Sequence, residues 1–180
     1  MRGKLPGMKL AIPVSAHDHV QGAATAAVTL VQYGDYECSY CGRAYPIVKA
    51  VQKALGAKLR FVFRNYPLTQ SHPHALHAAE VAEAVALHHD FWAIHDTLYQ
   101  HQAALDDRSL LGYARQLGLD PDKIATEASG EVVMARIKGD VEGGDRSGVT
   151  GTPAFYINGV QHTGSWDYEP LLGALERSLH

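Results

Sequence analysis

The stretch DYECSYCGRAYP, Asp35 to Pro46, contains both cysteines of the chain, Cys38 and Cys41, separated by two residues. A C-x-x-C pair can be half of a metal site, a structural staple or a reactive dithiol. The residues around the pair must decide between these three, because the spacing alone does not.

The cysteine pair lies between a predicted strand and a predicted helix. Residues 26–33, AAVTLVQY, are rich in β-branched and aromatic side chains and predict a buried strand. From about residue 39 to 55 the apolar side chains recur with helical spacing, and Pro46 is expected to kink that helix. Residues 59–64 predict a second strand. Short connections then favour parallel strands joined by a right-handed crossover.

The middle of the chain is predicted to be helical, and β-structure returns near its end. In PAFYINGVQHT, two apolar runs flank Asn158-Gly159, a pair that suits a type I′ hairpin turn. A last helix is expected over about 168–179. The helices predicted before the hairpin cover 74–89, 91–102, a segment opening at Asp106 or Asp107, a segment opening at Asp120-Pro121, and 131 to about 143.

The composition limits the classes of protein to which this chain can belong. The 180 residues are 46% hydrophobic, enough for one domain with a sizeable core, and the 16 basic and 19 acidic residues give a net charge of −3. This balance predicts binding to neither nucleic acid nor membranes. Residues 1–20 are interpreted as an N-terminal extension in which translation starts at Met1 or Met8. Prolines, a glycine and a lysine interrupt any secretory leader there, so we expect a cytoplasmic protein without a permanent structural disulfide.

Placement gives the two cysteines different roles. Cys38 falls where the strand has ended and the helix begins, and the free N–H groups and partial positive charge of a helix N-terminus stabilise a thiolate. Cys41 is three residues on, on the same helical face, where it can attack a mixed disulfide formed at Cys38. These features favour a dithiol/disulfide couple.

Other interpretations stay open at this point. Zinc needs about four ligands, of which the cysteines supply half, and His72, His74 and His77 could supply more. An inert structural pair is a further alternative. The Thr152-Pro153 bond, at the start of a strand, can be cis or an ordinary trans bond. Among other side chains, Tyr40 is expected to be exposed and to contact substrate, and Arg64 to be solvated.

The chain resembles the DsbA-like branch of the thioredoxin superfamily. The resemblance runs from about His19 to the C-terminus, and it is closest to stand-alone DsbA-like proteins that also occur fused behind sodium/proton antiporters. It is carried by VTLVQYGDYECSYCGRAYP, LRFVFRNYPL, HPHALHAAEVAEA, FWAIHDTLY and GVTGTPAFYINGVQHTG.

The resemblance implies an α/β thioredoxin-like fold with an all-helical domain inserted between the second and third strands. The thioredoxin-like domain would comprise residues 21–66 and 147–180, and the inserted domain residues 67–146. Cys38 would be the exposed nucleophile, Cys41 the resolving cysteine and Pro153 a cis-proline beside them. Thr152 would offer its backbone to an extended substrate peptide.

Three residues set this chain apart from its relatives or tune the cysteines. Gln32 stands where relatives often have an acidic residue that relays the proton of the resolving thiol. Glutamine cannot titrate, so water or another carboxylate, Asp35 or Glu37, would do this, or turnover would be slow. Ser39 stands where relatives often have proline. Glu37 would raise the pKa of the Cys38 thiol if its carboxylate lay close. The reduction potential and the direction of electron flow are therefore left open.

The predicted function is a monomeric thiol–disulfide oxidoreductase acting on protein thiols and disulfides or on glutathione. It needs no metal or organic cofactor, and glutathione or a thioredoxin-type reductant would reset it. One alternative is a glutathione-linked reductase or isomerase on the same fold. Another is a non-catalytic redox-sensing or metal-linked interaction protein.

Overall fold

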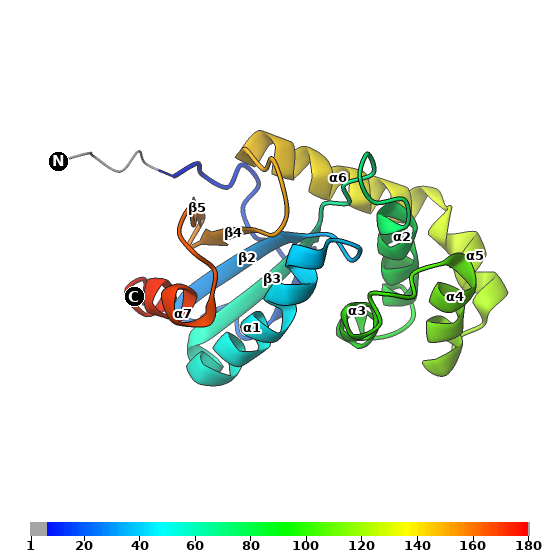
Figure 1. Ribbon diagram of the computed structural model, residues 1–180, viewed down its shortest axis with the longest axis horizontal. Coiled ribbons are helices and arrows are strands. Elements are labelled where there is room, and N and C mark those ends of the chain that lie inside the picture. Colours follow the sequence, from blue (N-terminus) through cyan, green and yellow to red (C-terminus); the bar gives the residue numbers. More distant parts are fainter. Residues whose placement is uncertain (1–6, 180) are drawn as a thin grey trace.

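A five-stranded mixed sheet forms the centre of the computed structural model, which describes residues 7–179 (Figure 1). Residues 1–6, with the Met1 start and the first part of the proposed extension, lie outside the described residues, as does His180. The strand order is β1-β3-β2-β4-β5, and only β2 and β3 are parallel. The strands are β1 (His19–Gln21), β2 (Val28–Gly34), β3 (Leu59–Asn65), β4 (Ala154–Ile157) and β5 (Val160–Gln161).

The predicted strand–helix–strand unit is present. Helix α1 (Ser39–Leu55) connects β2 to β3 and ends at Gly56, and the short 3₁₀ turn η1 (Gly56–Lys58) leads into β3. Both strands are buried along almost their whole length, as expected for central strands covered on both faces. Their register pairs Gly34 with Asn65, so the two strands end side by side.

Five helices lie between β3 and β4, which confirms the inserted helical region; the first four gather at one end of the sheet, and the fifth runs back over the sheet (Figure 1). Asp90, Asp106 and Asp120 each accept a backbone N–H at the start of a helix, so local capping chemistry set these boundaries. The helices are α2 (Ala75–Ala86), α3 (Phe91–Gln100), α4 (Asp107–Gln116), α5 (Pro121–Ala128) and α6 (Glu131–Ser147). The last helix, α7 (Tyr168–Glu176), follows the hairpin.

Helix α6 continues about one turn beyond its predicted end, through Gly143 and Gly144. A Cβ atom on Gly144 would lie 2.7 Å from Cδ2 of Tyr66, and one on Gly143 would lie 3.2 Å from Cγ1 of Ile12. These glycines therefore permit close packing inside the helix instead of ending it. The helix ends at Gly148, whose φ of 84° is left-handed.

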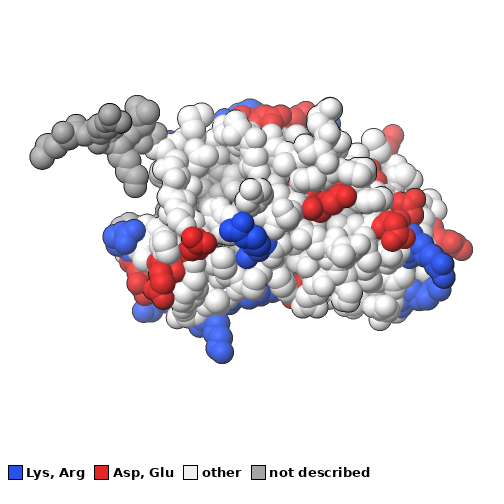
Figure 2. Space-filling model, viewed as in Figure 1, with Lys and Arg blue, Asp and Glu red and all other residues white. Residues whose placement is uncertain are grey.

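The sheet separates two apolar clusters. The larger one contains Leu30, Phe61 and Phe63 under α1 and α7, and it continues into the inserted helices. The smaller one contains Val31, Tyr33 and other residues on the opposite face, beside residues 10–14 and the end of α6. Figure 2 shows charged side chains of both signs scattered over one face of the molecule.

The described part of residues 1–20 packs against the fold. Strand β1 pairs antiparallel with β3, and Leu10 N–H donates to the Gly159 carbonyl. The expectation of a solvated Arg64 is wrong, because Arg64 is 3% exposed and its Nε lies 2.7 Å from Oδ1 of Asp18. A buried guanidinium needs such a partner. Within residues 7–179, no helix has the length and apolarity required to cross a membrane.

Candidate active site

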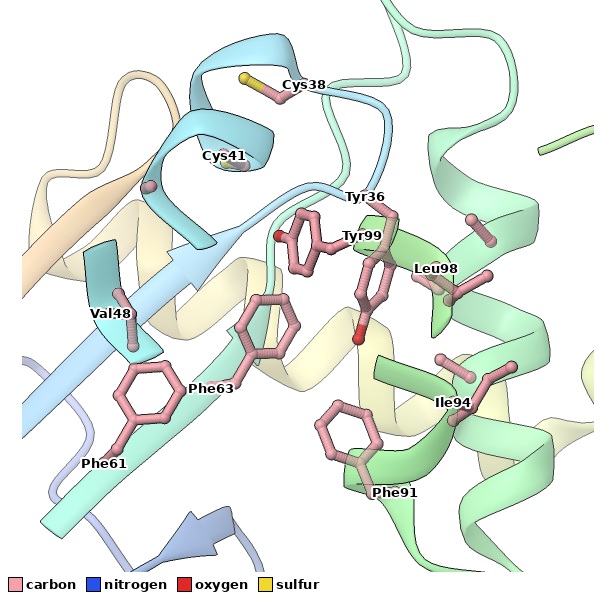
Figure 3. Packing of buried hydrophobic residues seen from close by; sticks show 14 of the residues in the cluster. Tyr36, Cys38, Cys41, Val48, Phe61, Phe63, Phe91, Ile94, Leu98 and Tyr99 are labelled. Atoms are coloured by element: carbon pink, nitrogen blue, oxygen red, sulfur yellow. The ribbon is translucent and has the colours of Figure 1, made fainter. Parts of the chain in front are cut away.

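Cys38 is the N-cap residue of α1, and Cys41 lies one turn further along the same helix (Figure 3). Both thiols are free, and the two cysteines lie 3.8 Å apart. The expected exposure of Cys38 is wrong: the residue is only 4% exposed. Its sulfur lies 3.5 Å from the carbonyl oxygen of Thr152, which can accept a hydrogen bond from the protonated form of Cys38 only, so the loop before β4 covers the sulfur.

The environment of Cys38 strongly favours its thiolate. The largest influence on the Cys38 pKa is a hydrogen bond from the Cys41 side chain, which lowers it. The Thr152 side chain and the backbone N–H groups of Cys41 and Tyr40 lower it further, whereas burial raises it. The resulting pKa is about 5. The helix N-terminus therefore contributes through its N–H groups, as predicted, but the second cysteine contributes more.

Cys41 has the opposite character. Its side chain is completely buried, and this burial is the main reason that its pKa is raised well above the usual value. The hydrogen bond to Cys38 and the charge of the Cys38 thiolate raise that pKa further. Two cysteines one helical turn apart thus hold one thiolate and one thiol.

Thr152 and Pro153 complete the pocket around Cys38. The peptide bond between them is cis. Within the described chain, the buried hydroxyl of Thr152 has no geometric hydrogen-bond partner, and it lies close enough to both cysteines to lower the pKa of each. The resemblance to a known family placed these two residues beside Cys38, although Thr152 is 114 positions away along the chain.

Asp35, which the sequence suggested only as a substitute proton relay, organises the segment around Cys38. Its fully buried carboxylate accepts the backbone N–H groups of Glu37, Cys38 and Leu68 at 2.8, 3.2 and 2.8 Å. The same carboxylate accepts Nδ1–H of His72 at 2.8 Å. An Asp shortly before a helix start is a known signal for an Asx turn, and here it fixes the segment that presents Cys38.

The inserted helices also hold this segment. Gln102, just after α3, donates from Nε2 to the carbonyl oxygens of Tyr36 and Cys38 at 2.8 and 2.7 Å. Tyr99 of α3 donates from its hydroxyl to the Asp35 carbonyl oxygen at 3.4 Å. Figure 3 shows Tyr36 and Tyr99 between the start of α1 and α3. The sequence contained no local signal for these contacts.

The remaining predicted residues occupy different positions. Gln32 is buried in β2 on the face that α1 covers, and Ser39 is the exposed first residue of α1. The Glu37 carboxylate accepts His74 N–H at 2.6 Å, so it is bound to the start of α2. Tyr40 is 56% exposed, as predicted, and the guanidinium carbon of Arg43 lies 5.4 Å from its ring centroid.

Two of the histidines considered as metal ligands are bound to carboxylates. His72 pairs with Asp35, and Nδ1 of His77 lies 3.1 Å from Glu80 in α2. Across residues 7–179, no group of three or more His, Cys, Asp or Glu side chains is arranged to hold a metal ion. The cysteine pair therefore has no further ligands around it in that part of the chain.

Comparison with known proteins identifies the family. The family described as thioredoxin matches residues 15–177. The chain belongs to the thioredoxin family. It is also 44% identical over 167 residues to the Na⁺/H⁺ antiporter NhaA 1 of Salinispora arenicola, which covers 92% of this chain and 26% of that protein. The corresponding antiporter of Mycolicibacterium vanbaalenii is 36% identical over 173 residues, 94% of this chain and 28% of the antiporter.

Solved structures give the same fold. BdbD from Bacillus subtilis superimposes with a TM-score of 0.82 at 21% identity, covering 96% of both chains. A thioredoxin-like oxidoreductase from Silicibacter pomeroyi superimposes with a TM-score of 0.81 at 26% identity, covering 91% of this chain and 93% of that one. The thioredoxin-family chain is thus similar to DsbA-like oxidoreductases, while it spans little more than a quarter of the antiporters that it matches.

Proposed function

We propose that this thioredoxin-family protein is a thiol–disulfide oxidoreductase whose redox couple is Cys38 and Cys41. One observation carries the proposal: Cys38 at the N-terminus of α1 lies 3.8 Å from a free Cys41 and beside the cis Thr152-Pro153 bond, an arrangement that lowers the pKa of Cys38 to about 5 and raises that of Cys41. At pH 7 such a Cys38 exists as roughly a hundred thiolates for each thiol. The first cysteine is then ready to attack, while the second keeps its proton until it is needed.

The exchange proceeds in two steps. The Cys38 thiolate attacks one sulfur of a substrate disulfide, forming a mixed disulfide and releasing the first substrate thiolate. Cys41 then gives up its proton to a released thiolate and attacks the Cys38 sulfur. A Cys38–Cys41 disulfide forms, the second substrate sulfur leaves, and two electrons have passed to the substrate. Because Cys41 already lies beside Cys38, this second step needs little movement.

The reverse direction is favoured by the same electrostatics. A stabilised thiolate stabilises the reduced dithiol, so the disulfide form gains a tendency to take electrons from substrate thiols. Lowering a thiol pKa from 9.0 to about 5 changes the exchange equilibrium at pH 7 about a hundredfold, or ~60 mV for two electrons. We therefore propose that the Cys38–Cys41 disulfide is a stronger oxidant than a disulfide between two ordinary cysteines would be at the same site.

The surroundings of Cys38 favour a protein as substrate. Thr152 lies beside the nucleophile in the segment that leads into β4, where its backbone can pair with an extended peptide. Tyr40 and Arg43 offer an exposed aromatic and cationic surface next to it. One chain carries both cysteines and Thr152, so we propose that it acts as a monomer without metal or organic cofactor, reset by glutathione or a thioredoxin-type partner.

The proposal is tested by mixing the disulfide form with a reduced, unfolded test protein and following disulfide formation. Wild type is expected to oxidise the test protein, and Cys38→Ser to lose this activity. Cys41→Ser is expected to accumulate a mixed disulfide at Cys38 when given an oxidised substrate, which mass spectrometry detects. Full activity in Cys38→Ser, or the absence of exchange by wild type in both directions, would contradict the proposal.

A further inference from the structure

Asp35 introduces a negative charge beside the proposed nucleophile. Its carboxylate lies three residues before Cys38 and is bonded to the Cys38 N–H itself. A carboxylate so close to a thiolate would oppose its formation unless another charge compensated it. The exchange reaction itself assigns no role to this acid.

His72 can supply the compensating charge when its ring is protonated. Of the basic side chains in residues 7–179, His72 alone forms an ion pair with Asp35, at 2.8 Å. Its ring comes from the loop between β3 and α2, so a distant part of the chain brings it to the start of α1. The His72 side chain is 25% exposed, which leaves the ring open to exchange its proton with water.

We propose that His72 is a positioning residue whose proton is coupled to the redox state of Cys38. In the reduced protein the imidazolium balances Asp35 and attracts the Cys38 thiolate. When the Cys38–Cys41 disulfide forms, the thiolate charge disappears and His72 holds its proton less firmly. The inference rests on the proposed function, since it assigns the redox couple to Cys38 and Cys41.

The charges around His72 support the coupling. The hydrogen bond to Asp35 is the largest influence and raises the His72 pKa against the effect of burial, and the charges of Asp35, Cys38 and Glu37 raise it further. Tyr99, which approaches Asp35 from α3, has a pKa raised well above its usual value and stays neutral. Because electrostatic coupling is mutual, a thiolate that raises the His72 pKa is itself stabilised by the imidazolium.

The proposed coupling adds the release of part of a proton to the formation of the disulfide. In the exchange, two electrons pass to the substrate disulfide and the Cys41 proton passes to a leaving thiolate. At a pH near the His72 pKa, disulfide formation additionally releases a fraction of a proton from His72 to water. The reduction potential of the couple should then show an extra dependence on pH in that range.

Nuclear magnetic resonance titration of the His72 ring tests this directly in three samples: the reduced wild type, its disulfide form and Cys38→Ser. His72→Asn identifies the resonance among the eleven histidines by its loss. We expect the His72 pKa to be higher in the reduced wild type than in the other two samples by about half a unit or more. An identical His72 pKa in all three samples would overturn the proposal.

A second readout reports the effect on Cys38. His72→Asn keeps an N–H donor near the Nδ1 position but cannot carry a charge, so we expect the Cys38 pKa to rise by about half a unit. His77→Asn, in the same region but paired with Glu80, should leave the Cys38 pKa unchanged. An equal effect of both variants, or of neither, would contradict the coupling.

The same titrations separate the two proposals. If Cys38 has a low pKa and exchanges disulfides while His72 does not respond, only the coupling fails. If the Cys38 pKa is that of an ordinary thiol in wild type, the proposed function fails, and the coupling fails with it.

Discussion

Two neighbouring strand ends each lie beside a buried carboxylate, and the surroundings of these two carboxylates differ. Strands β2 and β3 end side by side at Gly34 and Asn65. Beyond β2, Asp35 receives three backbone N–H groups and one imidazole N–H. At the end of β3, Asp140 of α6 receives Asn65 N–H at 2.9 Å, and burial raises its pKa to about 6. The buried Glu83 carboxylate nearby raises that pKa further.

The difference shows that burial alone does not decide what an acid does. Hydrogen-bond donors replace the water around Asp35, so its carboxylate can organise the loop that presents Cys38. Asp140 shares Asn65 with Glu83, whose nearby carboxylate disfavours the charged form of Asp140. The carboxylate at the end of β2 therefore supports the proposed site. The carboxylate at the end of β3 lowers the stability of the folded protein when it is ionised.

Asp35→Asn tests the first half of the comparison and should have the largest effect. An amide group cannot accept from all four donors and would turn its own N–H toward some of them. We expect the free energy of unfolding to fall by about 3 kcal/mol, as measured by urea denaturation near neutral pH. A variant as stable as wild type would show that the four contacts do not stabilise the loop.

Asp140→Asn tests the second half and should have the opposite sign. The pKa of Asp140 is higher in the folded state than its unfolded value of 3.8, so ionised Asp140 lowers the free energy of unfolding above about pH 6. The free energy of unfolding of wild type therefore rises as the pH falls from about 6 toward 4. The variant should be more stable than wild type by about 2 kcal/mol near pH 7.5, with little difference near pH 4. Equal destabilisation at both pH values would contradict this sign.

Gln102→Ala sharpens the comparison with a smaller effect at the Cys38 end. The variant loses both hydrogen bonds to the Tyr36 and Cys38 carbonyl oxygens, although the latter keeps its bond from Gly42 N–H. We expect a loss of about 1 kcal/mol in the free energy of unfolding. Gln100→Ala is the matched control, because Gln100 makes only an exposed contact with Tyr45, and it should change stability less. Indistinguishable variants would remove the proposed role of Gln102.

The features that sequence predicted best are local ones. The strand before Cys38, the helix after it and the caps at Asp106 and Asp120 depend on residues a few positions apart. The helix over 131 to about 143 was predicted to end too early. Gly143 and Gly144 fit inside α6 because they pack against distant residues such as Tyr66. Helix propensity alone could not reveal this contact.

The less predictable part of the site depends on long-range contacts. Asp35 finds Leu68 and His72 more than thirty residues away, and Gln102 reaches Cys38 across 64 positions. Burial of Arg64 likewise depends on Asp18, in a segment interpreted as an extension. Thr152 and Pro153 were placed beside Cys38 only through resemblance to a family, since no periodicity joins such distant residues.

The proposed function depends most on the low pKa of Cys38. The most direct measurement is therefore the pH dependence of Cys38 alkylation in the reduced protein. Cys41→Ala, which removes the hydrogen bond with the largest influence, should raise the midpoint, whereas Cys41→Ser keeps a donor and should raise it less. In wild type the account predicts a midpoint near pH 5. A midpoint at or above about 8.5, the value of a free cysteine, would contradict it.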